Sequence, residues 1–199
     1  MSSIDFWFSI GSTYSYLTVM RLPGIEDDTE IAFDWRPFSV RAIMIEMDNI
    51  PFAKKPIKAQ YMWRDIERRA DKYGIEATIP VPYPLEQFDL ANRVAVVGRK
   101  EGWCRNYVVA TYRRWFEKGQ LAGSDPNLSE SLAEIGQRPE RVIEEANSLQ
   151  IETDYLEATN EARSLGIFGA PTFVVQGELF WGDDRMDDAI SWYQTGRVG

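Results

Sequence analysis

Histidine is absent from the 199-residue sequence, and Cys104 is its only cysteine. The lack of histidine excludes serine–histidine and cysteine–histidine catalytic pairs, histidine-ligated metals and a histidine proton shuttle. A single cysteine also excludes an intrachain disulfide and a multi-thiolate metal site. We therefore expect no metal, and any chemistry must use hydroxyls, carboxylates, amines, backbone groups or a group supplied by another molecule.

Long apolar runs and long basic runs are also missing. No segment offers the roughly 20 apolar residues that cross a bilayer, and residues 1–5 lack the basic and apolar regions of a secretory signal. The formal net charge is −9, and Lys and Arg form no stripe that could neutralise a phosphate backbone. The sequence therefore predicts a soluble cytoplasmic protein that binds neither membrane nor nucleic acid.

The hydrophobic fraction of 44% is enough for the core of one compact unit. Residues 4–8 and 31–35 have the apolar patterns of buried strands. Between them, Ser12 is a good N-cap for a helix that Pro23 and Gly24 would end. This order predicts a parallel βαβ unit with a right-handed crossover.

Residues 39–166 have a mainly helical character. Residues 78–84 contain three prolines, which remove backbone donors and predict an ordered loop. Apolar spacing and start and stop signals predict helices over 56–74, 85–101, 103–118, 128–135, 139–147 and 155–165.

After Gly166 the strand pattern returns. Residues 172–175 and 178–181 flank a turn at Gln176 and Gly177, which predicts an antiparallel hairpin, and residues 186–193 predict a closing helix. This order resembles the thioredoxin layout. The resemblance implies an α/β thioredoxin-like fold whose βαβ and ββα halves, 1–38 and 167–199, are separated by an all-helical insertion over 39–166.

The segment 168–173 resembles the cis-proline loop of that layout. The resemblance implies that Pro171 is cis and faces the N-terminus of the first helix, where the backbone of Ala170 can pair with a peptide-like ligand. Redox-active thioredoxins carry two cysteines at the start of that helix, whereas this chain has Ser12 and Ser15. A dithiol oxidoreductase is thereby excluded. A helix N-terminus still favours an anion, so a thiolate bound there must come with a ligand.

Residues 5–17, which read DFWFSIGSTYSYL, resemble the opening of the kappa-class glutathione transferases and 2-hydroxychromene-2-carboxylate isomerases of the DsbA-like superfamily. In these proteins a serine donates a hydrogen bond to the glutathione sulfur, which implies that Ser12 is catalytic and that glutathione is the cofactor. Thr13 departs from the family, which usually has a proline there.

Two later segments extend the resemblance over the whole chain. Asn49, Lys58 and Tyr61 resemble the family's glutathione-contacting residues, and Asp183 and Asp184 resemble the acidic pair that holds the γ-glutamyl end. With Ser12, Ala170 and Pro171 they form the implied glutathione site. Each also has a simpler interpretation: Ser12, Asp183 and Asp184 as helix caps, Lys58 as a solvated lysine, and Tyr61 as a core aromatic.

The resemblance implies a glutathione-dependent isomerase of aromatic catabolism, which interconverts 2-hydroxychromene-2-carboxylate and trans-o-hydroxybenzylidenepyruvate by reversible thiolate addition. It also implies a homodimer. A kappa-class transferase and a non-catalytic thioredoxin-like binding protein are the alternatives. Cys104 is interpreted as structural, and residues 80–84 are a candidate pocket rim. Candidates to line an aromatic substrate pocket are Trp7, Trp35, Tyr83, Phe88 and Trp181.

Overall fold

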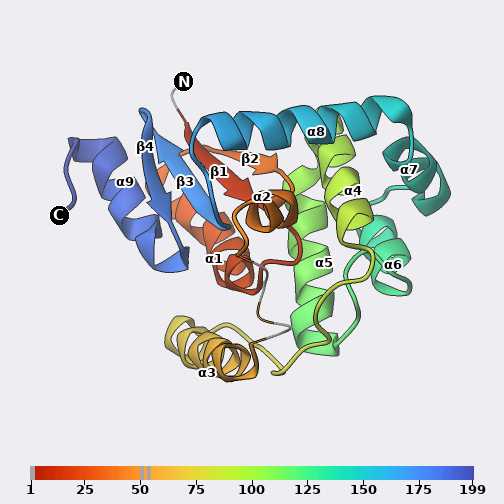
Figure 1. Ribbon diagram of the computed structural model, residues 1–199, viewed down its shortest axis with the longest axis horizontal. Coiled ribbons are helices and arrows are strands. Elements are labelled where there is room, and N and C mark those ends of the chain that lie inside the picture. The colour runs from red at the N-terminus through yellow and green to blue at the C-terminus, as the bar shows by residue number, and fades with distance from the viewer. Residues whose placement is uncertain (1–2, 50–51, 53–54) are drawn as a thin grey trace.

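The computed structural model describes residues 3–49, 52 and 55–199. A four-stranded sheet lies at its centre, with strand order β2-β1-β3-β4 (Figure 1). β1 pairs in parallel with β2 and antiparallel with β3, which in turn pairs antiparallel with β4. The strands are β1 (Ile4–Phe8), β2 (Phe33–Pro37), β3 (Thr172–Val175) and β4 (Glu178–Trp181).

Helix α1 (Thr13–Thr29) connects the two parallel strands, and α9 (Met186–Thr195) follows the hairpin and packs on β1, β3 and β4. The remaining helices lie between β2 and β3 in the sequence, and α4 and α8 contact β2 (Figure 1). They are α2 (Val40–Glu46), α3 (Pro56–Tyr73), α4 (Phe88–Glu101), α5 (Cys104–Lys118), α6 (Asn127–Glu134), α7 (Pro139–Ala146) and α8 (Leu149–Ser164). The predicted thioredoxin-like α/β fold with a helical insertion is confirmed. The division at residues 38 and 167 stays a prediction.

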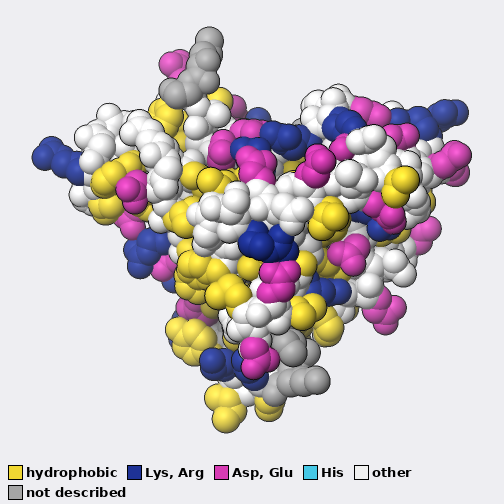
Figure 2. Space-filling view, turned by 45° about the horizontal axis from the view of Figure 1, so that its top comes forward, with side chains coloured by type: hydrophobic (Ala, Val, Ile, Leu, Met, Phe, Trp, Pro, Cys, Tyr) yellow, Lys and Arg dark blue, Asp and Glu magenta, His cyan; other side chains and the backbone are white. Residues whose placement is uncertain are grey.

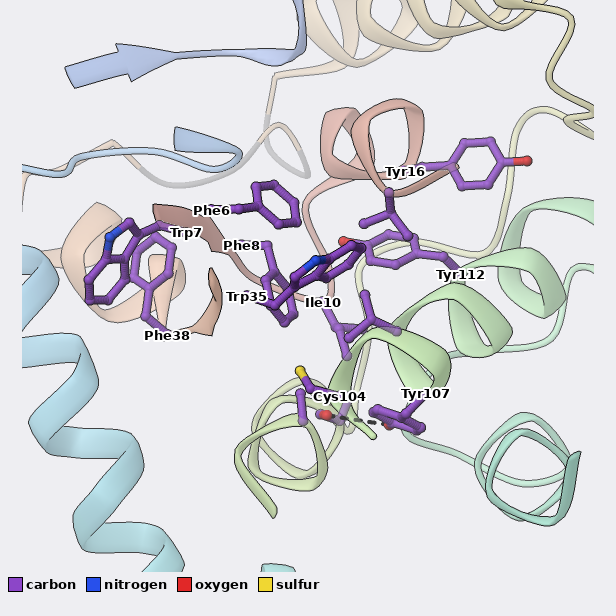
Figure 3. Close-up of a cluster of buried hydrophobic side chains, with 14 of the residues drawn as sticks. Phe6, Trp7, Phe8, Ile10, Tyr16, Trp35, Phe38, Cys104, Tyr107 and Tyr112 are labelled. Atoms are coloured by element: carbon purple, nitrogen blue, oxygen red, sulfur yellow. Dashed lines mark hydrogen bonds between the residues drawn. The ribbon is translucent and has the colours of Figure 1, made fainter. Parts of the chain in front are cut away.

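Aromatic side chains fill both faces of β1 (Figure 3). Phe6 stacks on Phe173 with ring centroids 5.5 Å apart and meets the edge of Trp35 at 5.0 Å, whereas Trp7 packs against Phe38 on the other face at 5.8 Å. Trp7 is 0% exposed and Trp35 is 6% exposed. The expectation that these two tryptophans could line a substrate pocket is therefore wrong. Trp7 lies on the inner strand β1, and Trp35, on β2, is covered by the rings of Phe6 and Phe8.

Helix α1 does not end at Pro23 and Gly24 but continues to Thr29. Its last turns are held by Glu26, which accepts a hydrogen bond from the Phe33 backbone nitrogen at 3.3 Å and pairs with Arg105 at 3.0 Å. These tertiary contacts offset the one backbone hydrogen bond that the proline removes. Strand β2 accordingly begins two residues later than the sequence predicted, with Phe33 opposite Ile4.

Charged side chains of both signs are interspersed on the face shown in Figure 2. Arg36 lies 2.7 Å from Glu161, Lys100 lies 2.6 Å from Asp154, and Arg163 lies 2.7 Å from Glu46.

Within the described ranges, the helices are all too short or too polar to cross a membrane.

Candidate functional site

Ser12 lies between the end of β1 and the first turn of α1. Its Oγ accepts a hydrogen bond from the Ser15 backbone nitrogen at 3.4 Å, as an N-cap does, and donates to the Ala170 carbonyl at 2.7 Å. The peptide bond between Ala170 and Pro171 is cis, which confirms the sequence prediction. The start of the first helix therefore directly faces the cis-proline loop.

Two glycines permit this close approach. Gly11 has a φ of 120°, and a Cβ on it would lie 2.6 Å from the ring of Phe88. A Cβ on Gly169 would lie 2.2 Å from the indole nitrogen of Trp181. Any larger residue would push Phe88 or Trp181 away from the turn that carries Ser12 or from the Pro171 loop.

Two fully buried polar side chains from the helical insertion hold the turn at residues 9–12. Asn92 of α4 accepts a hydrogen bond from the Ile10 nitrogen at 2.7 Å and donates to the Ile10 carbonyl at 2.9 Å. The Tyr112 hydroxyl of α5 lies 3.0 Å from the carbonyl oxygens of Ser9 and Ser12. Burial raises the pKa of Tyr112, so it remains a protonated donor.

The sequence motifs pointed to neither of these residues. The signal was present in Asn92, a polar residue on the apolar face of a helix beside Ala91 and Ala95. Buried polar side chains in that position usually satisfy a specific backbone partner. The partner itself lies 82 residues away and could not be named from the sequence.

Helix α3 attaches to the first turns of α1. Thr13 directs its hydroxyl to the sulfur of Met62 at 3.1 Å, and the Tyr14 hydroxyl donates to Asp65 at 3.1 Å. Thr13 thus provides a side-chain contact between the two helices at the start of α1.

Of the three predicted contacts around α3, two lie on its exposed surface. Tyr61 is 63% exposed, with the guanidinium carbon of Arg68 5.9 Å from the centre of its ring, and Lys58 is exposed one turn earlier. Tyr61 is therefore not the core aromatic of the simpler interpretation. Asn49 is also exposed, and its backbone nitrogen donates to Met44 at 2.8 Å.

Asp183 and Asp184 differ in their surroundings. Asp183 is 2% exposed, accepts a hydrogen bond from Thr18 at 3.1 Å, and lies 3.6 Å from Arg21 and 3.8 Å from Arg69. Burial raises the pKa of its carboxyl, although both arginines oppose this. The Asp184 carboxylate is 45% exposed and lies 3.7 Å from Arg69. Arg69, on α3, therefore connects this acidic pair to the helix that carries Lys58 and Tyr61.

Exposed aromatic side chains lie beside the Pro171 loop. Trp181 is 54% exposed and Phe168 is 39% exposed, with their ring centroids 4.8 Å apart.

Tyr83, in the irregular segment over residues 78–84, packs against Trp63 with ring centroids 5.8 Å apart. The predicted loop is thus confirmed. Phe88 is 3% exposed and forms a wall behind Gly11 rather than an open pocket surface.

Cys104 is buried in the core next to α4, and burial raises the pKa of its thiol. A protonated buried thiol is a poor nucleophile. The site at Ser12 therefore combines a hydroxyl donor, a helix N-terminus and a cis-proline loop without a thiol of its own, an arrangement suited to binding an anion.

Comparison with known proteins relates this arrangement to a family. A family model described as a DSBA-like thioredoxin domain matches residues 3–194. A 2-hydroxychromene-2-carboxylate isomerase from Sphingobium xenophagum is 28% identical over 187 residues, covering 93% of this chain and 94% of that protein. Glutathione S-transferase kappa 1 from Caenorhabditis elegans is 25% identical over 196 residues, covering 92% and 87%.

A solved 2-hydroxychromene-2-carboxylate isomerase structure has a TM-score of 0.83 to this chain at 22% identity. The match covers 93% of this chain and 91% of that one, so the shared architecture includes the helical insertion as well as the sheet.

Proposed function

This chain belongs to the DSBA-like thioredoxin domain family, and we propose that it is a glutathione-dependent isomerase that interconverts 2-hydroxychromene-2-carboxylate and trans-o-hydroxybenzylidenepyruvate. The observation that carries the proposal is the Ser12 hydroxyl, 2.7 Å from the Ala170 carbonyl at the cis-proline loop. In a chain whose only cysteine is buried Cys104, a hydroxyl at this position is suited to hold a thiolate brought by a ligand.

The donors and acceptors around the site fit glutathione. A hydroxyl at a helix N-terminus fits its thiolate, the exposed Asp184 fits its ammonium group, and the exposed Lys58 fits a carboxylate. When bound, glutathione would supply a thiolate that adds to the double bond of the substrate and is later eliminated. Between these two events the ring C–O bond would open and the former double bond would rotate, so that elimination would give the trans double bond and regenerate glutathione.

Ser12 has the central role in this proposal. With glutathione bound, its hydroxyl would donate a hydrogen bond to the thiolate in place of the Ala170 carbonyl. The first backbone N–H groups of α1 have no intrahelical partners and add a favourable field. Both effects lower the pKa of the thiol from about 8.5, and each pKa unit corresponds to about 1.4 kcal/mol.

The rest of the tripeptide would extend between α3 and the segment after β4. We assign contacts to Asn49, Lys58, Tyr61 and Asp184, with the Pro171 loop beside the peptide backbone. Asp183 is too deeply buried to contact the ligand directly. We assign it the role of holding the side chains of Arg21 and Arg69 in place. Trp181 and Tyr83 are exposed enough to contact the aromatic ring of the substrate.

A kappa-class transferase is the second candidate, supported by the similarity to the nematode transferase. It would use the same activated thiolate but leave glutathione attached to an electrophile. A non-catalytic binding protein would bind a peptide at the Pro171 loop and produce neither reaction.

The test is an assay with purified protein and 2-hydroxychromene-2-carboxylate, with and without glutathione. We expect loss of chromene absorbance only when both protein and glutathione are present. Conjugate formation with a nitroaromatic chloride in place of isomerisation would identify a transferase. If millimolar glutathione leaves the thermal midpoint unchanged, both enzymatic proposals are rejected.

We predict that Ser12→Ala retains the fold and lowers kcat/KM about 10–100-fold, the effect of one hydrogen bond to a charged group. Loss of the donor raises the pKa of the bound thiol, so the pH–rate profile should move to higher pH. Ser15→Ala is the matched control, since this serine is buried and only its backbone nitrogen bonds Ser12. Activity of Ser12→Ala within about two-fold of the parent would remove Ser12 from the mechanism.

A further inference from the structure

Arg41 differs from the other arginines that the structure describes. In a chain with 31 acidic and 22 basic residues, nearly every described arginine is within ion-pair distance of a carboxylate. Among the described residues, those outside such pairs are Arg41, Arg138 and Arg197. Arg138 and Arg197 are exposed, whereas Arg41 is partly buried. A partly buried guanidinium without a carboxylate is a candidate anion-binding group.

Uncharged groups hold the Arg41 side chain in place. Its Nη2 donates to the Leu85 carbonyl at 3.0 Å, and its guanidinium carbon lies 4.0 Å from the centre of the Phe88 ring. One carbonyl oxygen occupies only part of the five-donor guanidinium fork. The side chain is thus oriented, with donors left for a planar anion.

The platform under Arg41 also supports the turn that carries Ser12. A Cβ on Gly11 would lie 2.6 Å from Phe88 and 3.7 Å from Leu85, the same two residues that hold Arg41. Asn92 strengthens this connection because it donates to the Phe88 carbonyl at 2.8 Å as well as bonding Ile10. Arg41 is therefore separated from Gly11 by a single layer of side chains.

Two tyrosine hydroxyls are affected by the charge of Arg41. Burial raises the pKa of the Tyr83 hydroxyl, and the charge of Arg41 opposes this rise. Burial also raises the pKa of Tyr155, and the charge of Arg41 opposes this rise. The Tyr155 hydroxyl donates a hydrogen bond to Asp89 at 3.4 Å. Tyr83, whose ring packs on that of Trp63, is thus an aromatic neighbour of Arg41.

We propose that Arg41 binds the carboxylate of the substrate and selects planar aromatic carboxylates over neutral aromatic electrophiles. The inference rests on the proposed function and extends it, because it gives the substrate a second anchor separate from the thiolate site at Ser12. Arg41 orients the ring by a bidentate contact while Tyr83 contacts its face.

The test measures binding of chroman-2-carboxylate, which lacks the reactive double bond, and of the neutral chroman-2-carboxamide, by calorimetry with glutathione present. We expect Arg41→Gln to weaken carboxylate binding about 10–100-fold and to leave amide binding and glutathione affinity unchanged. Arg41→Lys should recover only part of the loss, since an ammonium cannot form a planar bidentate contact. Arg138→Gln, which removes the same charge from an exposed site, should leave the affinity for both ligands unchanged.

Kinetics give an independent readout. With the chromene substrate, Arg41→Gln should raise KM about 10–100-fold and change kcat much less, because the carboxylate is equally charged in ground and transition states. Equal losses in glutathione and chroman-2-carboxylate affinity would place Arg41 in the glutathione site and overturn the inference. Unchanged carboxylate affinity would overturn it as well.

Failure of this inference can be separated from failure of the proposed function. If the parent protein binds chroman-2-carboxylate through Arg41 but does not isomerise the chromene, the isomerase proposal fails and the anion site stands. If it isomerises the chromene and Arg41→Gln does so with unchanged KM, the anion site fails and the isomerase stands. Should Arg41→Gln fail to fold, Arg41→Lys supplies the comparison, and full carboxylate affinity in that variant would reject the bidentate contact.

Discussion

Asp183 is a carboxyl group that the fold removes almost completely from solvent. Its Oδ1 accepts the bond from Thr18, and its Oδ2 lies 3.8 Å from Arg69. A hydrogen bond from Tyr73 also favours its charged form. Burial raises the pKa above the ordinary value of 3.8 despite the neighbouring arginines. Desolvation of the charged form is therefore the dominant effect.

We predict that Asp183→Asn changes the pH dependence of stability. Because the folded-state pKa is raised, the folded protein binds the Asp183 proton more tightly than the unfolded chain does. Asp183 therefore adds stability as pH falls through its folded pKa toward 3.8, and this contribution is lost as pH rises. Relative to Asp183→Asn, the parent protein should gain stability in denaturant titrations between pH 7 and pH 4.

Asp28→Asn is the control for the change in net charge, since Asp28 is exposed on α1. A difference between parent and Asp183→Asn that is constant with pH would show that Asp183 does not titrate in this range. A difference that moves in the opposite direction would mean that the two arginines stabilise its charged form more than burial destabilises it.

Ser12 illustrates how one residue satisfies both a local and a distant requirement. Its hydroxyl oxygen accepts a hydrogen bond from the backbone nitrogen of Ser15, three residues later. The same hydroxyl donates a hydrogen bond to the carbonyl oxygen of Ala170, 158 residues away. The N-cap interpretation and the site interpretation are therefore compatible. The first follows from the local sequence, and the second depends on the chain returning to this point through β3.

Helices α4 and α5 act on the site through the turn at residues 9–12. They contribute Asn92 and Tyr112, whose hydrogen bonds fix Ile10, Ser9 and Ser12 before any ligand binds. The insertion is thus part of the machinery that positions Ser12. Alignment of this kind matters because small displacements of a reacting group cost large factors in rate.

We predict that Tyr112→Phe lowers stability by about 1–2 kcal/mol and kcat/KM about tenfold. The ring remains in the core, but the carbonyl oxygens of Ser9 and Ser12 lose their donor. Tyr107→Phe is the matched control, because Tyr107 is also fully buried on α5 but bonds the Ala91 carbonyl at 3.3 Å, away from the turn. Denaturant titration and the chromene assay give the two quantities.

Tyr107→Phe should lose comparable stability and retain activity. Equal activity losses in the two variants would show that the effect comes from general loosening of α5. A further distinction is the pH–rate profile, which should shift only in Tyr112→Phe, where the hydrogen-bond geometry of Ser12 changes.

A single hydrophobic cluster runs through the sheet and the helical insertion. It includes Phe6 and Phe8 of β1 together with Tyr107 and Tyr112 of α5 (Figure 3). Helix α3 differs, since its buried residues are Met62, Ile66 and Ala70 and it lies at the margin of the fold (Figure 1). The molecule should therefore have one cooperative core and a less firmly attached helix.

We predict that amides of β1 and α5 exchange with solvent through the same global unfolding, whereas amides of α3 exchange through a smaller opening. β1 and α5 are coupled because their side chains pack in the same core. Helix α3 has few buried residues and should therefore have a lower local stability. Hydrogen exchange measured at increasing denaturant would give these free energies. An α5 that opens well before β1 would instead support two separate cooperative units. Glutathione should raise the protection of α3, because its proposed contacts include Lys58 and Tyr61.

The sequence by itself determined the features that depend on neighbouring residues. Ser12 as a cap, the turn at Gln176 and Gly177, the irregular segment over 78–84 and the absence of a usable thiol all follow from local backbone preferences or from composition. The apolar run of residues 4–8 also predicted a strand. Such features need no knowledge of distant contacts, because steric limits and hydrogen bonding act within a few residues.

Only the tertiary structure decided which residues share a surface. It extended α1 beyond Pro23, placed Trp7 and Trp35 in the core, and brought Asn92 and Tyr112 to the turn before Ser12. It also left Arg41 beside Phe88 without a carboxylate. These outcomes depend on contacts between segments separated by dozens of residues, and local propensity carries no information about which distant side chain fills a given space.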